Sequence, residues 1–123
     1  MRMKEMVRRT GVNERLLRYY EQQGLLHPER LPSGYRVYSE ADVDTVRRVR
    51  CLLAAGLPTA AIAQILPCLR DEDDRLVPTC PDLLAQLREQ RDRMTARMEA
   101  LSTSRGLLDA VLDAAPAELT AAR

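Results

Sequence analysis

Arginine and tyrosine side chains are concentrated in two short stretches of the first forty residues, where their chemistry suits binding to a polyanion. The first stretch contains Arg15, Arg18, Tyr19 and Tyr20, and the second contains Arg30, Tyr35, Arg36 and Tyr38. Guanidinium groups pair with phosphates or with guanine edges, and tyrosine hydroxyls reach the nucleic-acid backbone. Two arginines on one helix are by themselves more often a solvated basic face. The prediction of DNA binding therefore depends on the elements that carry them.

Thiols are the other groups with chemistry of their own. Cys80 falls at the start of a long predicted helix, whose dipole favours a thiolate, and Cys68 precedes it by twelve positions. The pair is compatible with a disulfide, with a two-thiolate metal site completed by another subunit, or with two incidental thiols, which the wide spacing favours. Cys51 is expected to pack within a helix, and His27 to lie in a loop. No cofactor is expected.

The composition predicts a small, mainly helical protein. The chain has 123 residues, of which 46% are hydrophobic and 30% charged, with no Phe or Trp, so aliphatic side chains and Met must build the core. The net charge is +1, but residues 1–50 carry 11 basic and 7 acidic side chains, which hints at a basic half that faces a polyanion. Because no apolar run reaches about 20 residues and no signal-peptide core is present, we expect a cytoplasmic protein with no membrane partner.

Two short helices joined by a glycine-containing turn are expected at the N-terminus. The apolar spacing predicts helices over 3–9 and 14–23, with Asn13 capping the second and Gly24 ending it. Two helices joined in this way have the sequence shape of a helix-turn-helix. Residues 25–38, interrupted by Pro and Gly, are expected to form a small β-hairpin or wing whose tip lies at the Ser-Gly pair.

Two further helices complete the expected domain, which spans residues 1–70. A capping box at Ser39 and Asp42 predicts a helix that ends near residue 55, and a short helix follows Pro58. The inward face of the longer helix is expected to carry Val43, Val46, Val49 or Arg50, and Leu53. Residues 71–80, which begin with an acidic run, are expected to be a solvated connector loop.

Residues 81–114 are predicted to form one uninterrupted helix, on the order of 50 Å long. Its heptad seam consists of Leu87, Met94, Leu101 and Leu108. The apolar stripe is too narrow for a lone helix to be stable, and the chain contains no second long helix to cover it. An isologous homodimer is therefore expected. Residues 115–123 are expected to be a short tail, too small to enclose a ligand.

A series of short motifs resembles the DNA-binding domain of MerR-family transcriptional regulators. The series consists of residues 9–12 (RTGV), 18–21 (RYYE), 24–26 (GLL) and 34–38 (GYRVY), followed by Asp42. The resemblance covers residues 1–70 densely and the long helix by architecture only. It implies a winged helix-turn-helix, followed by a long dimerisation helix that pairs two subunits in an antiparallel coiled coil on a palindromic operator.

The resemblance also implies a set of contacts and a mechanism. The second helix would enter the major groove, and the wing would hold the flanking backbone. The residues implied as DNA contacts are Arg15, Arg18, Tyr19, Tyr20, Arg30, Tyr35 and Arg36. For Tyr20, a position in the apolar stripe makes core packing at least as favoured. Family members distort promoter DNA so that RNA polymerase can use it, which makes DNA deformation the energetic basis of regulation.

The resemblance leaves the effector open. Metal sensors of the family carry two cysteines after the long helix, whereas residues 116–123 here contain neither Cys nor His. One alternative is a thiol-based redox or metal-responsive regulator of the same fold that uses Cys68 and Cys80. A coiled-coil adaptor without DNA binding is a second, although Arg15, Arg18 and Arg36 argue against it. An enzyme is not expected, because the chain has neither a CxxC motif nor a Gly-rich phosphate loop.

Overall fold

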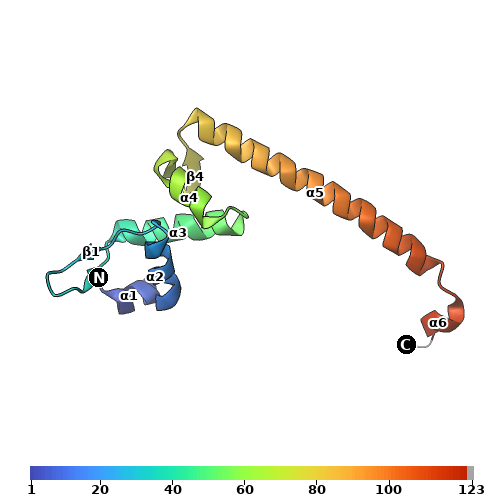
Figure 1. Ribbon diagram of the computed structural model, residues 1–123, viewed down its shortest axis with the longest axis horizontal. Helices are drawn as coiled ribbons and strands as arrows, with labels where there is room; N and C mark the ends of the chain where they lie inside the picture. The colour runs from blue at the N-terminus through green and yellow to red at the C-terminus, as the bar shows by residue number, and fades with distance from the viewer. Residues whose placement is uncertain (122–123) are drawn as a thin grey trace. The chain divides into compact units, whose positions relative to one another are not determined.

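The computed structural model describes residues 1–121, which form two compact units (Figure 1). The N-terminal unit spans Met1–Cys80, and the C-terminal unit begins at Pro81. The N-terminal unit contains α1 (Met3–Thr10), α2 (Glu14–Gln22), β1 (Glu29–Arg30), β2 (Arg36–Val37), α3 (Glu40–Ala54), α4 (Thr59–Ile65), the 3-10 turn η1 (Leu66–Cys68), β3 (Leu69–Glu72) and β4 (Arg75–Pro78). The C-terminal unit contains α5 (Pro81–Asp113) and α6 (Ala117–Ala121). The expected mainly helical fold, with a hairpin wing and one long helix, is confirmed.

The turn between α1 and α2 is built from two local interactions. Gly11 ends α1 at φ +71°, a left-handed conformation that glycine adopts without steric cost, and its N–H donates to the carbonyl of Val7 at 2.9 Å. Asn13 then caps α2, because its Oδ1 accepts a hydrogen bond from the N–H of Leu16 at 2.8 Å. These two residues fix where α2 begins.

The core of the N-terminal unit holds its helices together through aliphatic side chains and two tyrosines. Its buried residues are Met6, Val12, Leu17, Tyr20, Leu25, Leu26, Tyr38, Val46, Val49, Leu52, Ile62, Ile65 and Leu69. Helices α1 to α4 each contribute at least one side chain with no measurable exposure. The rotation of α2 about its axis is thereby set, since Leu17 and Tyr20 must face inward.

Two expectations for α3 are corrected by the structure. The buried side chains are Val46, Val49 and Leu52, whereas Val43 and Leu53 are only half-buried. Cys51, which was expected to pack, is exposed and carries a free thiol. Cys51 follows Val49 by two positions, and a step of two residues turns about 200° around a helix, which brings it to the far side.

The wing is a two-stranded antiparallel hairpin, as predicted. Arg30 pairs with Arg36 in the register of β1 and β2, and the N–H of Gly34 donates to the carbonyl of Leu31 across the tip. The strand direction continues to Tyr38, whose N–H donates to the carbonyl of Met1 at 2.7 Å. The Met1 ammonium donates in return to the Tyr38 carbonyl at 2.6 Å. The first residue of the chain therefore secures the end of the wing.

The expected connector loop at residues 71–80 is instead largely a second hairpin. Leu69 pairs with Pro78 and Glu72 with Arg75 in the antiparallel register of β3 and β4. Asp73 and Asp74 form the turn at φ +50° and +61°. Aspartate tolerates this left-handed conformation better than most residues do, and two consecutive positive φ angles are what a tight hairpin turn requires. The acidic run therefore contributes the turn of a hairpin, which the absence of glycine had concealed.

The C-terminal unit consists mainly of α5, a helix of 33 residues. Along the expected seam, Leu87 and Met94 are half-buried, while Leu101 and Leu108 are 70% and 65% exposed. The apolar stripe is thus uncovered over the C-terminal half of the helix in a single chain. The expected tail contains the short helix α6, and its last two residues lie outside the described part of the chain. Over residues 1–121, no helix combines the length and apolar character needed to cross a membrane.

Replacement of Asn13 tests the cap that starts α2. We expect Asn13→Ala to lower the free energy of unfolding by about 1 kcal/mol, because the Leu16 N–H loses its acceptor. Asn13→Asp keeps the acceptor and is the matched control. Urea denaturation of the three proteins at one concentration measures the effect, and equal stability of the Ala and Asp variants would contradict the role of the cap.

Candidate nucleic-acid interface

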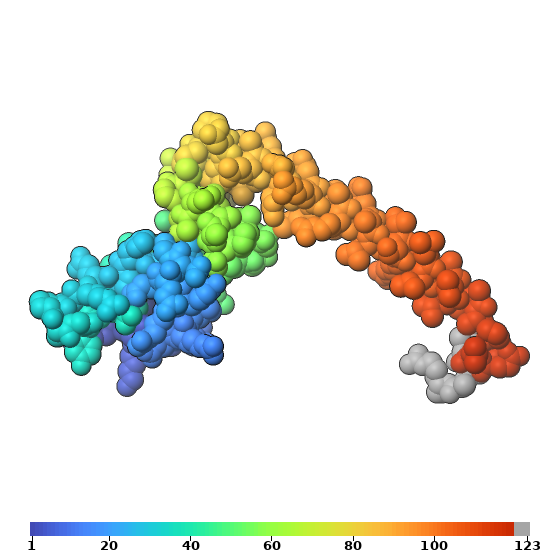
Figure 2. All heavy atoms as spheres, viewed as in Figure 1, coloured from blue at the N-terminus to red at the C-terminus, as the bar shows by residue number. Residues whose placement is uncertain are grey.

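The outward face of α2 carries the first stretch of predicted contact residues. Because Leu17 and Tyr20 are buried, the opposite side of the helix presents Arg15, Arg18 and Tyr19 to solvent. A shallow hollow of about 650 Å³ on this side is lined by Glu14, Arg15, Arg18, Tyr19 and Gln22. In Figure 2, the blue segment that includes α2 and the cyan segment of the wing both lie on the surface of the N-terminal unit.

The two arginines of α2 differ in their surroundings. Within the described residues Arg15 makes no ion pair, whereas Arg18 donates from Nη2 to Oε1 of Glu14 at 2.7 Å. Both members of that pair are about half exposed, and a surface ion pair of this kind contributes about 0–1 kcal/mol. Arg18 can therefore exchange the carboxylate for a phosphate or a base edge at little cost.

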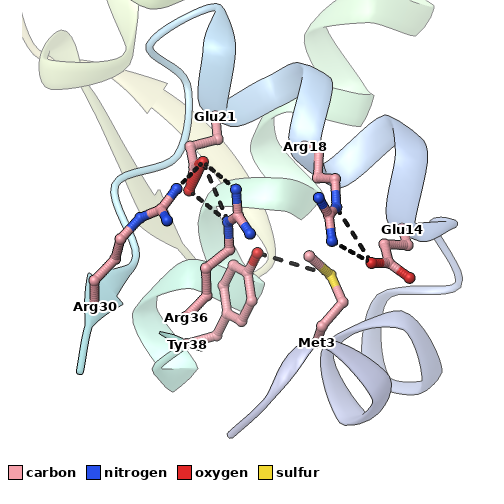
Figure 3. Close-up of polar contacts among 7 residues, drawn as sticks. All are labelled: Met3, Glu14, Arg18, Glu21, Arg30, Arg36 and Tyr38. Atoms are coloured by element: carbon pink, nitrogen blue, oxygen red, sulfur yellow. Dashed lines mark hydrogen bonds and ion pairs between the residues drawn. The ribbon is translucent and has the colours of Figure 1, made fainter. Parts of the chain in front are cut away.

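Glu21, near the C-terminal end of α2, connects the helix to both strands of the wing (Figure 3). Arg36 of β2 donates from Nε to Oε1 at 3.0 Å and from Nη2 to Oε2 at 3.2 Å. Arg30 of β1 donates from Nη2 to Oε2 at 3.4 Å. Glu21 and Arg36 are only 21% and 20% exposed, so solvent weakens this pair less than it weakens the pair on the α2 surface.

The ionisation of Glu21 reflects these partners. The hydrogen bond from Arg36 lowers the pKa of the Glu21 carboxyl, and partial burial opposes this shift. The same hydrogen bond raises the pKa of the Arg36 guanidinium. Both groups are therefore charged near neutral pH, and the pair holds the wing in a fixed position relative to α2.

The tip of the wing adds an exposed aromatic ring to this surface. Tyr35 is well exposed, and the guanidinium of Arg2 lies 4.4 Å from the centre of its ring. Arg2 had no role in the sequence-based interpretation. The structure brings its charge to the wing because Met1 pairs with the backbone at Tyr38. Nothing in the local sequence around Arg2 signals that pairing.

The structure assigns Tyr20 to the core, which corrects its prediction as a DNA contact. The side chain is only 2% exposed, and burial raises the pKa of its hydroxyl. Tyr38 is buried to the same extent, and its hydroxyl donates to the sulfur of Met3 at 3.8 Å. Of the four tyrosines, Tyr19 and Tyr35 therefore remain available to a partner.

Glu21 is a second residue of the candidate site, after Arg2, that sequence reasoning missed. It stood within the RYYE motif but received no role. The signal that could have identified Glu21 is its position directly after Tyr20, which is buried. A carboxylate so close to the core needs a cationic partner. Arg30 and Arg36 are two basic residues of the hairpin that follows, but only the folded wing shows that both reach one carboxylate.

Two of the three cysteines of the N-terminal unit are paired. Cys68 and Cys80 form a disulfide, with their Cα atoms 5.6 Å apart. Among residues 1–121, no group of three or more His, Cys, Asp or Glu side chains is arranged to hold a metal ion. Of the alternatives that the sequence left open for this pair, the structure therefore shows the disulfide.

Comparison with known sequences identifies regulators of one kind. Residues 1–68 match the family described as MerR HTH family regulatory protein. The heavy metal-dependent transcription regulator 2 of Rhizobium meliloti (strain 1021) is 39% identical over 72 residues, which cover 58% of this chain and 49% of that protein. The HTH-type transcriptional regulator AdhR of Bacillus subtilis (strain 168) is 33% identical over 91 residues, or 73% of this chain and 64% of that protein. The chain thus spans from about half to just under two thirds of the length of these relatives.

Two solved structures share the fold. The N-terminal part of MtaN, the Bacillus subtilis multidrug transporter activator, superposes with a TM-score of 0.69 at 23% identity, over 91% of this chain and 97% of that one. HiNmlR, a MerR family regulator that lacks the sensor domain and is bound to promoter DNA, superposes with a TM-score of 0.57 at 21% identity, over 91% of this chain and 86% of that one. At these identities the likeness concerns the fold.

The Glu21 ion pair predicts a specific pH dependence of stability. The folded-state pKa of Glu21 lies below its ordinary value of 4.5, so the pair stabilises the fold fully above that pH. The stabilisation is lost as the pH falls from 4.5 through the lower folded-state pKa. Glu21→Gln has no charge to titrate, and every other carboxyl is the same in both proteins. We expect the difference in free energy of unfolding between the wild type and Glu21→Gln to shrink below pH 4.5. Urea titrations from pH 3 to pH 7 measure it, and a constant difference would contradict the assignment.

Proposed function

The chain belongs to the MerR family of helix-turn-helix regulatory proteins, and from this premise we propose that it is a homodimeric transcription regulator that binds a palindromic promoter site. The observation that carries the proposal is the exposed face of α2 beside a wing that Glu21 holds in position. Arg15, Arg18 and Tyr19 point outward on that face, and the cations of the wing follow in the chain, where Arg30 and Arg36 pair with Glu21 of the same helix. Polar and cationic groups on a fixed helix are what recognition of a duplex requires.

In this proposal α2 enters the major groove. The helix has nine residues and is about 13 Å long at 1.5 Å per residue, and a major groove about 12 Å wide admits one helix. Arg15, Arg18, Tyr19 and Gln22 are spaced by three or four residues and so share one side of the helix. An arginine can form two hydrogen bonds with a guanine edge, whereas Tyr19 suits the sugar-phosphate backbone.

The wing would contact the backbone beside that groove. Arg30 is half exposed and Tyr35 lies at the tip with Arg2 against its ring. Arg36 is mostly covered by its pairing with Glu21. We therefore propose Arg30, Tyr35 and Arg2 as backbone contacts, and Arg36 as the residue that positions them.

A second copy of the chain would cover the exposed stripe of α5. Leu101 and Leu108 are largely exposed in the single chain, together with Met98, Val111 and Leu112, and a contiguous apolar stripe of this kind is typical of an interaction surface. Two antiparallel copies of the helix would bury each other's stripes in a coiled coil. A dimer with two-fold symmetry presents two α2 helices, and this symmetry matches a palindromic site.

Regulation would follow from deformation of the bound promoter. A dimer that holds both half-sites can bend or twist the DNA between them, at an energetic cost that depends on the sequence of that DNA. RNA polymerase would then use the altered promoter without a new contact to the regulator. HiNmlR in complex with promoter DNA supports DNA as the partner, and the family, which consists of regulators, supports a role other than catalysis. Such a protein would work in the cytoplasm.

Selection of binding sites from a random duplex library, with the full chain as bait, tests the proposal. A palindromic consensus is the expected result, and the affinity for it should fall steeply with salt as phosphate contacts release counterions. Absence of enrichment, with no salt-dependent binding to any duplex, would instead support a coiled-coil adaptor that has lost DNA binding.

Arg18→Ala tests the groove contact. We expect affinity for the selected operator to fall by about tenfold to a hundredfold, because one bidentate arginine contact contributes about 1–3 kcal/mol. Arg88→Ala removes an exposed arginine from α5 and is the matched control. Fluorescence anisotropy measures both affinities, and sedimentation verifies that the oligomeric state is unchanged. An Arg18→Ala protein with the affinity of the control would remove this residue from the interface.

Leu101→Lys tests the seam of α5. A lysine at this position would place an unpaired charge in the buried stripe, so we expect the dimer to dissociate at micromolar concentration. Thr103→Lys lies about 200° around the helix and is the control that should remain dimeric. Analytical ultracentrifugation distinguishes the two states. A Leu101→Lys protein that sediments like Thr103→Lys would mean that the dimer interface lies elsewhere.

A further inference from the structure

The disulfide between Cys68 and Cys80 closes the base of the β3–β4 hairpin. One residue inside it, Thr79 donates to the Cys68 carbonyl from its N–H at 2.8 Å and from its hydroxyl at 3.0 Å. We propose that this pair is a reversible thiol–disulfide site through which hydroperoxides and small dithiols control operator affinity. The proposal rests on the DNA-binding function proposed above and adds the chemistry that regulates it.

DNA binding implies a cellular compartment in which the Cys68–Cys80 disulfide is expected to be reversible. A protein that binds promoter DNA works where the genome lies, and there the cellular thiol systems keep cysteines reduced. Disulfides that form in such compartments are usually transient and are used in catalysis or redox sensing. A pair of cysteines held at bonding distance in this protein is therefore better suited to reversible oxidation than to permanent stabilisation.

The local structure makes the pair both preorganised and reachable. Cys68 and Cys80 are half-buried rather than enclosed in the core, so a small oxidant or reductant reaches them. The paired strands and the two Thr79 hydrogen bonds hold the ends of the hairpin together without the disulfide. Reduction would therefore leave the thiols close to each other, and closure of the bond would be fast and repeatable.

The oxidation balances with a hydroperoxide as the named oxidant. One thiolate attacks a peroxide oxygen, the O–O bond breaks, and the products are a sulfenic acid and an alcohol that takes up the thiol proton. The second thiolate attacks the sulfenic sulfur, forms the S–S bond and releases hydroxide, which takes up the second thiol proton to give water. Two electrons thus pass from the two thiols to the peroxide. A dithiol reductant returns two electrons and two protons by exchange.

The hairpin connects this chemistry to α3. Asp71 of β3 accepts hydrogen bonds at Oδ2 from Arg48 of α3 at 2.6 Å and from Arg47 at 3.1 Å. These contacts lower the pKa of the Asp71 carboxyl, so it is ionised near neutral pH. The hairpin is thus tied to α3 by Asp71 and closed at its base by the disulfide.

The junction with the C-terminal unit lies directly beside the bond. Cys80 is the last residue of the N-terminal unit, and α5 begins at Pro81. In the oxidised protein the residue before α5 is covalently joined to the end of η1. In the reduced protein only the Thr79 hydrogen bonds and the strand pairs restrain it. Reduction therefore increases the conformational freedom of the chain where the two units meet.

This freedom would change operator affinity because both halves of a dimer must bind one DNA at once. A junction with more accessible conformations loses more entropy when the two α2 helices are fixed in their half-sites. We expect the oxidised protein to bind the selected operator at least about fivefold more tightly than the reduced protein, which is the lower end of typical allosteric coupling.

The structural part of the inference has a test that does not involve DNA. The full chain is reduced with dithiothreitol, then treated with hydrogen peroxide, and peptide mass spectrometry locates the bond. The expected result is a Cys68–Cys80 disulfide that forms and reopens, with faster amide hydrogen exchange over residues 69–80 in the reduced state. Failure to form this bond, or identical exchange in both states, would overturn the inference whatever the protein does with DNA.

The regulatory part is tested by operator affinity in both redox states. Wild type, Cys68→Ser and Cys51→Ser are measured by anisotropy on the selected operator, with and without dithiothreitol. The redox effect should vanish in Cys68→Ser and persist in Cys51→Ser, which removes the free thiol only. Equal affinity of oxidised and reduced wild type would overturn the inference while leaving DNA binding intact. Absence of binding in both states, with the exchange difference present, would overturn the DNA-binding proposal and the regulatory role that rests on it.

Discussion

The Glu21 carboxylate accepts hydrogen bonds from Arg36 and Arg30, and in this way it joins α2 to both strands of the wing. The rest of the interface depends on this junction, because two strands of two residues each do not form a stable hairpin by themselves. The buried ring of Tyr38 and its backbone pairing with Met1 secure the end of the wing. With the wing and α2 held as one body, side chains from both reach a partner without first being ordered.

The same pairing divides the cations of this surface into two groups. Arg36 is largely neutralised and covered by Glu21, so its main contribution is position. Arg15 has no ion-pair partner among the described residues, and the partner of Arg18 sits on an exposed surface where ion pairs are weak. A polyanion can therefore take up these two cations without breaking the structure that presents them. This division explains how a chain with a net charge of only +1 can still offer a cationic face.

Much of this arrangement could be predicted from the sequence, because it depends on local signals. Asn13, Gly11 and the Ser39–Asp42 box mark helix ends, and the spacing of Leu17 and Tyr20 fixes the buried side of α2. The errors concern contacts between distant segments or unusual turn chemistry. A two-aspartate turn hid the β3–β4 hairpin, and the proximity of Arg30 and Arg36 to Glu21 depends on how the wing folds back. Cys51 was misplaced because Cys51, Leu52 and Leu53 are consecutive apolar residues. Their pattern does not show which side of α3 faces the core, and only the packing of α1 and α4 against α3 decides it.

The role of the β3–β4 hairpin follows from its two attachments, one to α3 and one to the start of α5. Asp71 binds Arg47 and Arg48, and α3, which carries both, lies against α1 of the helix-turn-helix. The base of the hairpin ends at Cys80, next to the first residue of α5. A restraint at this point acts on the only covalent path between the helices that would bind DNA and the helix that would pair two subunits. A single disulfide can therefore affect a property of the whole dimer. The fit of the dimer to its two half-sites depends on how freely each unit moves about that covalent path.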